Sequence, residues 1–270
     1  MANATANETA LLVDLTAQIA AFTAKMDTFK ADKNESMDTI WMLLASALVF
    51  FMHAGFSLLE AGSVRKKNAQ NILAKNLLVV TMGFLCWYFF GYGLALGAAD
   101  SPGRFAGAAN FAMTDFTGGD YRVWFFQGAF CATGATIVSG AMAERTQLKG
   151  FGLYTILMTT IIYPIVVYWG WSGNGIFNYT DAAGNGVSVA GPGLIDFAGS
   201  GIVHMVGGVG ALVGALVVGP RKGRWRGDDD FDAHNVPFLV LGTFFLWFGW
   251  YGFNPGSTAS MHDKVTANSA

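Results

Sequence analysis

The segment that decides the fold runs from Asp196 to Arg221 and reads DFAGSGIVHMVGGVGALVGALVVGPR. Its apolar part is long enough to cross a bilayer as a helix, which takes about 20 mostly apolar residues. An ionisable side chain inside such a segment is costly and marks a candidate functional site, so Asp196 and His204 stand out. The segment also carries four glycines that let another helix approach closely: Gly207, Gly208, Gly210 and Gly214. We therefore expect it to pack against other helices.

The composition is typical of a protein with several membrane spans. Of the 270 residues, 53% are hydrophobic and 13% are charged, whereas soluble domains average about 25% charged residues. The formal net charge of −2 gives no electrostatic support to nucleic-acid binding. We therefore predict an all-α polytopic membrane protein with six transmembrane helices. The six apolar segments are Ile40–Gly62, Leu77–Gly97, Trp124–Met142, Phe151–Trp171, Leu194–Gly219 and Val236–Phe253.

Lysine and arginine gather in alternate loops, which sets the expected orientation. The loops between spans 1 and 2, 3 and 4, and 5 and 6 carry Arg65, Lys66, Lys67, Arg145, Lys149, Arg221, Lys222, Arg224 and Arg226. The loops on the other side carry only Arg104 and Arg122. Because cytoplasmic loops hold an excess of positive residues, we expect the N-terminus outside. The expected location is the plasma membrane.

Residues 1–35 are expected to form an extracellular N-terminal tail with an amphipathic, heptad-like helix. Large apolar residues in it alternate at spacings of three and four: Leu12, Leu15, Ile19, Phe22, Met26 and Phe29. One interpretation is a helix lying on the membrane or on the protein, and the other is a short coiled coil joining protomers. Residues 36–260 are expected to hold the spans, and residues 261–270 a C-terminal end.

With this orientation, four spans place an aromatic or polar group at one outer level: Phe126, Trp171, Asp196 and Ser257. Phe130 and Phe253 follow one turn deeper. His204 lies eight residues after Asp196, hence about 12 Å deeper at the rise of a helix. That depth is near the middle of a hydrocarbon core about 30 Å thick.

These side chains together suit a small cation that can lose a proton. Aromatic faces attract a cation, and more strongly where it is partly desolvated. A serine hydroxyl can accept a hydrogen bond from it, and phenylalanines below would exclude hydrated ions. A neutral imidazole in the membrane can hydrogen-bond a small molecule or relay a proton.

Each of these residues also has a structural interpretation. Asp196 is a favoured residue for capping a helix, and Trp171 is typical of an interfacial belt. Phe126, Phe130 and Phe253, taken singly, are typical packing residues. The histidine is the hardest to explain by packing, because an ionisable group at the midplane is rare.

At these residues the chain resembles the ammonium transporter family, the Amt/Mep/Rh superfamily, with the Amt branch the closer one. Besides the segment from Asp196 to Arg221, four motifs carry the resemblance. They are AGSVRKKN at 61–68, FQGAF at 126–130, GAMAER at 140–145 and FGWYGFNPGS at 248–257. The likeness covers about residues 36–260.

The resemblance implies a role for each candidate residue. Phe126, Trp171 and Ser257 match the outer site that recruits ammonium, and Asp196 matches an aspartate near it. Trp169 is an alternative to Trp171, which we prefer for its place before the outer loop. The stacked phenylalanine gate is matched by Phe130 and Phe253. The first of two pore histidines is matched by His204.

The resemblance also implies an architecture and a set of partners. The family has about eleven spans, arranged as two inverted five-span repeats and a last helix, and it assembles as homotrimers with a pore in each protomer. Six predicted spans would be the first half of that fold, so we expect a fragment of a longer product rather than a divergent short form. The implied partners are ammonium or ammonia and the lipid bilayer, with no cofactor.

Two functions remain in view after these observations. One is transmembrane transport of ammonium or ammonia, and the other is a non-transporting sensor or regulatory subunit that keeps the recruitment site. An unrelated aromatic-lined channel is disfavoured by the long motif that begins at Asp196. The sequence shows no nucleophile–base arrangement and no metal-ligand spacing, so we do not expect an enzyme.

Overall fold

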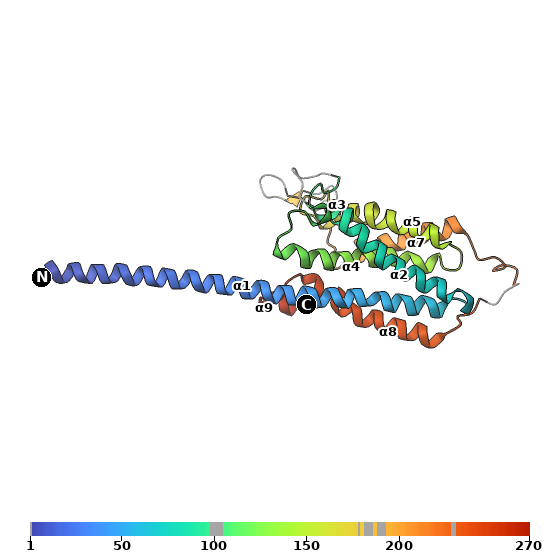
Figure 1. The fold of residues 1–270 in the computed structure, drawn as a ribbon, viewed down its shortest axis with the longest axis horizontal. Helices are drawn as coiled ribbons and strands as arrows, with labels where there is room; N and C mark the ends of the chain where they lie inside the picture. The colour runs from blue at the N-terminus through green and yellow to red at the C-terminus, as the bar shows by residue number, and fades with distance from the viewer. Residues whose placement is uncertain (1, 98–104, 178, 181–185, 188–192, 228–230) are drawn as a thin grey trace.

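The computed structural model describes residues 2–97, 105–177, 179–180, 186–187, 193–227 and 231–270. It is a bundle of helices from which the first half of one long helix projects (Figure 1). That helix, α1, runs from Ala2 to Ser63 without interruption. The expected boundary between a tail at 1–35 and the first span therefore falls inside a single continuous helix.

The remaining elements follow in antiparallel order. Helix α2 (Ala69–Cys86), the π-helical segment η2 (Trp87–Gly91) and α3 (Tyr92–Leu96) form one rod, and α4 (Gly118–Ala141) returns. The next two rods are α5 (Leu148–Leu157), η4 (Met158–Ile162) and α6 (Tyr163–Trp171), then η5 (Ser200–Met205) and α7 (Val206–Val218). The last long helix is α8 (Val236–Phe253).

Short elements connect or follow these rods. They are η1 (Lys66–Asn68), η3 (Phe111–Met113), the antiparallel pair β1 (Tyr179–Thr180) and β2 (Gly186–Val187), η6 (Pro255–Thr258) and α9 (Lys264–Ser269). We call the end of the bundle from which α1 projects the tail end. The opposite end, where Ser63 and Val218 lie, is the basic end, because the lysine- and arginine-rich loops are there.

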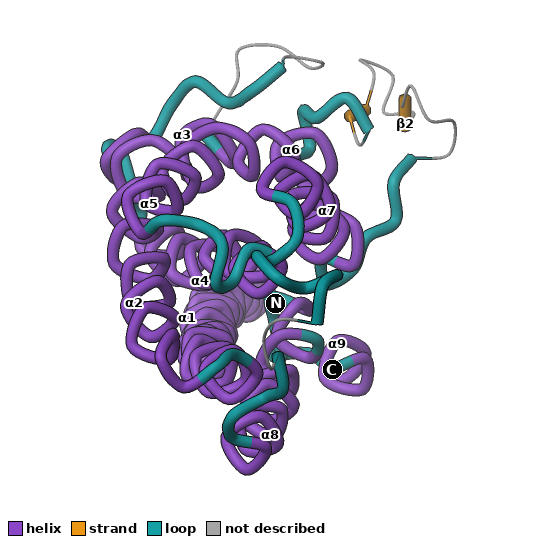
Figure 2. Tube along the Cα trace, turned by 90° about the vertical axis from the view of Figure 1, so that its right-hand side faces the viewer, coloured by secondary structure: helices purple, strands orange, loops and turns teal. Residues whose placement is uncertain are grey.

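Within the described residues, five helices are long and apolar enough to cross a membrane. They are Ala10–Ser63, Lys66–Leu96, Leu148–Trp171, Ser200–Val218 and Val236–Thr258. The predicted third span forms α4, which has 24 residues and is about 36 Å long at the rise of a helix. Helix α4 is not among these five helices, because it is less apolar than they are. It packs against α1, α2, α6 and α7 in the interior of the bundle, as the end-on view of Figure 2 shows. In this position it carries alanine, threonine and serine where a lipid-facing helix would carry large apolar residues.

Glycines set how closely the helices approach. A Cβ atom at Gly242 of α8 would lie 2.3 Å from the backbone nitrogen of Leu59, and one at Gly249 would lie 2.1 Å from Met52 Cγ. The pair α1–α8 therefore depends on small residues, as is common in membranes. On α7, Gly207 and Gly210 face α4 in the same way, and Gly214 faces Met142 at its end. The predicted packing of this glycine-rich helix is thus confirmed for three positions, while Gly208 has open space around it.

The fifth rod begins later than expected. The predicted span started at Leu194, with Asp196 in the first helical turn, but the helix begins at Ser200. Gly199, with φ +91°, turns the chain into the helix in a left-handed conformation that glycine adopts without strain. Asp196 therefore precedes the helix, and its role is seen in the contacts it makes there.

Candidate functional site

The carboxylate of Asp196 holds the start of η5. Its Oδ1 accepts hydrogen bonds from the backbone nitrogens of Gly199 (2.8 Å) and Ser200 (2.9 Å), and from the Ser200 hydroxyl (3.3 Å). Its Oδ2 accepts from the nitrogens of Gly201 (3.0 Å) and Ile202 (2.7 Å). The first N–H groups of a helix have no partner within it, and Asp196 satisfies four of them from outside the helix.

The indole of Trp171 ties the end of α6 to this turn. Its Nε1 donates to the backbone oxygen of Asp196 at 2.6 Å, and its ring centroid lies 6.1 Å from that of Phe130. Trp169, the alternative in the sequence, points elsewhere: it donates to the backbone oxygen of Phe105 and packs against Phe177. Of the two tryptophans, Trp171 is therefore the one that contacts other candidate residues.

Three phenylalanines form a column inside the tail half of the bundle. The rings of Phe126 and Phe130, one turn apart on α4, have centroids 4.4 Å apart. The ring of Phe253 on α8 stacks on Phe130, with centroids 4.0 Å apart and an interplanar angle of 13°. All three side chains are buried, with exposed fractions of 3%, 0% and 1%. The close pairing of Phe130 and Phe253 cannot be read from either helix alone.

His204 lies next to this column. Its ring meets that of Phe253 edge to face, with centroids 5.4 Å apart. Its Nδ1 lies 3.3 Å from the backbone oxygen of Gly199. The side chain is exposed and lines a hollow of about 590 Å³. The other lining residues are Phe197, Ala198, Ser200, Trp250, Phe253 and Asn254.

Ser257 lies past the end of α8, in η6. Its hydroxyl donates to the backbone oxygen of Phe253 at 2.7 Å, which leaves the oxygen able to accept. The neighbouring Gly256 brings this turn against α4, since a Cβ there would lie 3.2 Å from the Phe126 ring. The structure thus gathers Phe126, Phe130, Trp171, Phe253 and His204 through ring contacts, with Asp196 and Ser257 attached through the backbone.

No sequence pattern predicted the buried polar cluster between α1, α2 and α4. Glu60 Oε2 accepts from Ser139 Oγ (2.8 Å) and from Asn76 Nδ2 (3.3 Å), and Asn76 Oδ1 accepts from Thr136 (2.8 Å). Lys75 is 1% exposed and donates to the backbone oxygen of Ser139. The signal in the sequence was Glu60, a carboxylate within an apolar span.

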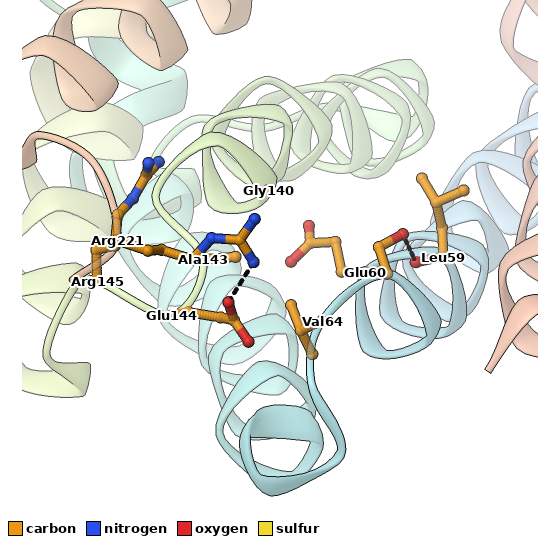
Figure 3. A pocket seen from close by; sticks show the side chains of 9 residues that line it. Leu59, Glu60, Val64, Gly140, Ala143, Glu144, Arg145 and Arg221 are labelled. Carbon is orange, nitrogen blue, oxygen red and sulfur yellow. Dashed lines mark hydrogen bonds and ion pairs between the residues drawn. The ribbon is translucent and has the colours of Figure 1, made fainter. Parts of the chain in front are cut away.

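A second unpredicted cluster joins three loops at the basic end. Glu144 Oε1 accepts from the backbone nitrogen of Arg65 and from Asn68, and Oε2 pairs with Arg221 at 2.5 Å. Burial alone would raise the pKa of Glu144, but hydrogen bonds, first among them that from Arg221, lower it to about 2. Figure 3 shows this pair at a cavity of about 340 Å³ that Glu60 also lines. Among the described residues, no cluster of three or more histidine, cysteine, aspartate or glutamate side chains could hold a metal.

Comparison with known proteins identifies the class of protein. A model of the Ammonium Transporter Family matches residues 40–270. The chain belongs to this family. It is therefore an integral membrane protein, with the partial polytopic all-α fold that the sequence predicted, and the predicted family resemblance is confirmed.

Similar proteins come from distant organisms. The chain is 41% identical over 235 residues to Ammonium transporter 1 member 3 of Solanum lycopersicum, which covers 85% of this chain and 50% of that protein. It is 39% identical over 245 residues to Ammonium transporter Amt2 of Archaeoglobus fulgidus, covering 88% of this chain and 51% of that protein. The chain spans about half the length of these relatives.

Solved structures agree on the fold. A Sensor Amt Protein superposes with a TM-score of 0.75 at 35% identity, covering 85% of this chain and 56% of that one. Candida albicans Mep2 superposes with a TM-score of 0.71 at 33% identity, covering 83% of this chain and 49% of that one. Both similarities extend over most of the described bundle.

Proposed function

We propose that the assembly containing this chain moves ammonium or ammonia across the membrane, along a route lined by Phe126, Phe130, Phe253 and His204. The observation that carries the proposal is the order of these side chains. An aromatic column lies in the tail half of the bundle, and a histidine beside Phe253 faces a hollow. Relatives named as ammonium transporters support the choice of substrate.

Recruitment would take place at the tail end. The rings of Phe126 and Trp171 can attract a small cation, and the Ser257 oxygen can accept a hydrogen bond from it. Asp196 acts as a positioning residue, because backbone N–H groups occupy both of its carboxylate oxygens. Its charge still favours a cation nearby, and it keeps the helix that bears His204 in place.

The phenylalanine pair acts as the gate. With centroids 4.0 Å apart, the stacked rings of Phe130 and Phe253 leave no room between them, so one ring must turn for a molecule to pass. A hydrated ion is too large to follow. Beyond the gate, the imidazole nitrogens of His204 can hydrogen-bond ammonia or relay a proton.

The exposure of His204 bears on the assembly. In transporters built from inverted repeats, the substrate route runs between the repeats, and here His204 faces an open hollow. We propose that residues outside 1–270 supply the facing wall, including a second pore histidine, within a homotrimer in the plasma membrane. The N-terminus would then lie outside, because the basic loops lie at the opposite end of the bundle.

The test is uptake of ammonium by the complete gene product that contains residues 1–270. Expressed in cells that lack their own ammonium uptake, it should restore uptake, whereas the purified 270-residue chain in liposomes should conduct nothing. Uptake by the 270-residue chain alone would contradict the proposed second wall. A structural neighbour titled as a sensor keeps the sensor alternative open, and a well-inserted product that binds ammonium without uptake would favour it.

A further inference from the structure

The projecting half of α1 has no neighbour within the described part of the chain. Every side chain from residue 10 to residue 33 is exposed, and Figure 1 shows this segment beyond the end of the bundle. The sequence before Gly55 contains no glycine and no proline, so neither of these helix-breaking residues interrupts or kinks the helix. The segment is therefore a stiff continuation of the first span, in line with it, rather than a helix lying flat on a membrane.

One face of this segment is apolar. Its stripe alternates at spacings of three and four, with Leu12 62%, Ile19 58% and Phe22 66% exposed. Leu15, Met26 and Phe29 complete the stripe. The opposite face repeats a small residue at intervals of seven: Ala10, Ala17, Ala24 and Ala31. A continuous exposed apolar stripe of this kind marks an interaction surface, and this spacing is that of a coiled-coil seam.

The apolar stripe is interrupted at Lys33 and Ser36, and the same alternation resumes in phase in the membrane-spanning part of α1. Continuing the same alternation beyond Phe29 reaches Ile40, Leu43 and Phe50, which are 68%, 45% and 41% exposed. On a straight helix, a seven-residue repeat rotates around the helix axis by about 20° per heptad. Between the middle of the tail stripe and Leu43 the repeat therefore rotates by roughly 60°. This rotation is smaller than the width of an apolar stripe, about 100°, so the two parts of the stripe overlap on one side of the helix. A partner that follows the stripe would thus also meet the outward face of the first span.

We propose that residues 12–29 of α1 form a parallel coiled coil with the same segment of another copy of this chain. Copies inserted in one membrane with one orientation project their tails in the same direction. Each stripe residue then meets its own counterpart, which a self-complementary seam requires. The proposal concerns assembly and does not depend on what the protein conducts.

The flanking residues indicate where the pairing is strongest. In a parallel coiled coil the positions beside the seam face each other across the interface. Near the N-terminal end these are Thr16, Gln18 and Thr23, which are uncharged. Further on, Lys25 of one helix would face Lys30 of the next, which weakens that end. The firmest contact is therefore from Leu12 to Phe22, farthest from the membrane.

Single cysteines test the seam directly. Ile19→Cys and Phe22→Cys lie on the stripe, and Ala17→Cys and Ala24→Cys are matched controls on the opposite face of the same exposed helix. The native Cys86 and Cys131 are buried, so the unmodified chain serves as the blank. After mild oxidation of the full chain in membranes, we expect strong disulfide-linked dimers from the two stripe variants and little from the two controls. Equal crosslinking at all four positions, or none, would overturn the proposal.

A second measurement separates a copy of the chain from other occupants. We expect a double variant, Ile19→Asp with Phe22→Asp, to speed the exchange of subunits between differently tagged assemblies, while Ala17→Asp with Ala24→Asp does not. Protection of Ile19→Cys from a water-soluble maleimide by lipid, without any crosslink, would instead mean that the stripe binds the membrane. Protection by another protein, again without a crosslink, would equally contradict self-association.

Discussion

The ring of Phe253, on the last long helix, lies parallel to the ring of Phe130 on the interior helix, with centroids 4.0 Å apart. Both side chains are fully enclosed. The pair joins α4 to α8 across the bundle, so movement of either ring changes the packing of the column. Because we propose that the same rings close a route, a test has to separate that role from packing.

Phe130→Leu in the complete gene product should reduce the selectivity for ammonium over potassium, because a smaller side chain leaves the column open. Removing part of a buried aromatic side chain also costs stability, on the order of 1–3 kcal/mol. Phe151→Leu is the matched control, since Phe151 is equally buried but packs on Lys75 and Tyr154, away from the column. Equal selectivity in both variants, at equal expression, would make Phe130 a packing residue only.

In the complete gene product, His204→Ala should abolish or uncouple ammonium uptake while leaving insertion and assembly intact. The side chain is exposed in this chain, so its loss should shift the thermal midpoint little. Met205→Ala, at the next and similarly exposed position, is the control and should transport normally. Uptake and thermal unfolding are measured on the same preparations. Normal uptake by the histidine variant would remove His204 from the route.

Hydropathy and helical periodicity located the rods, but matched both ends of a helix only for α8. Val236–Phe253 is predicted with the bounds that α8 shows, because Asn235 and Pro237 mark its start and Asn254-Pro255 its end. The start of the fifth rod was misplaced by six residues, from Leu194 to Ser200. Its boundary depends on a left-handed Gly199 and on the bonds of Asp196 to backbone nitrogens, which no hydropathy pattern reports.

The candidate site was predictable one residue at a time, but its contacts were not. Depth along each helix placed Phe130 and Phe253 at one level, yet their stacking depends on how α4 and α8 are rotated in the bundle. The polar cluster around Glu60 was missed for a related reason. Its partners come from α2 and α4, and only the fold brings Asn76 and Ser139 to this carboxylate.

Glu144 should make stability at the basic end depend on pH. Its pKa is lowered to about 2, from an unfolded value near 4.3. Its contribution is therefore fully present above the unfolded pKa and is lost as the pH falls through the folded pKa. That shift corresponds to at most about 3 kcal/mol. We expect Glu144→Gln to lower the thermal midpoint at pH 7, and to lower it less at pH 3.

Glu35→Gln provides the comparison, because Glu35 also pairs with an arginine, Arg122, but its side chain is 60% exposed. Exposed pairs contribute little, so its midpoint should match that of the unmodified protein at both pH values. Thermal unfolding followed by tryptophan fluorescence measures all three proteins. A Glu144→Gln difference that stays constant from pH 7 to pH 3 would mean that ionisation of this carboxylate does not stabilise the fold.

The orientation of the bundle can be tested at its two ends. We expect the loop that follows α7 to face the cytoplasm, because it carries four of the basic residues. Lys222→Cys is the better probe there, since Lys222 is exposed whereas Gly223 has φ +83°, which a side chain would strain. Thr28→Cys, exposed on the projecting helix, reports the other end. In intact cells an impermeant thiol reagent should label Thr28→Cys at once, and Lys222→Cys only after the membrane is permeabilised. The reverse pattern would invert the orientation and place the residues proposed for recruitment on the cytoplasmic side.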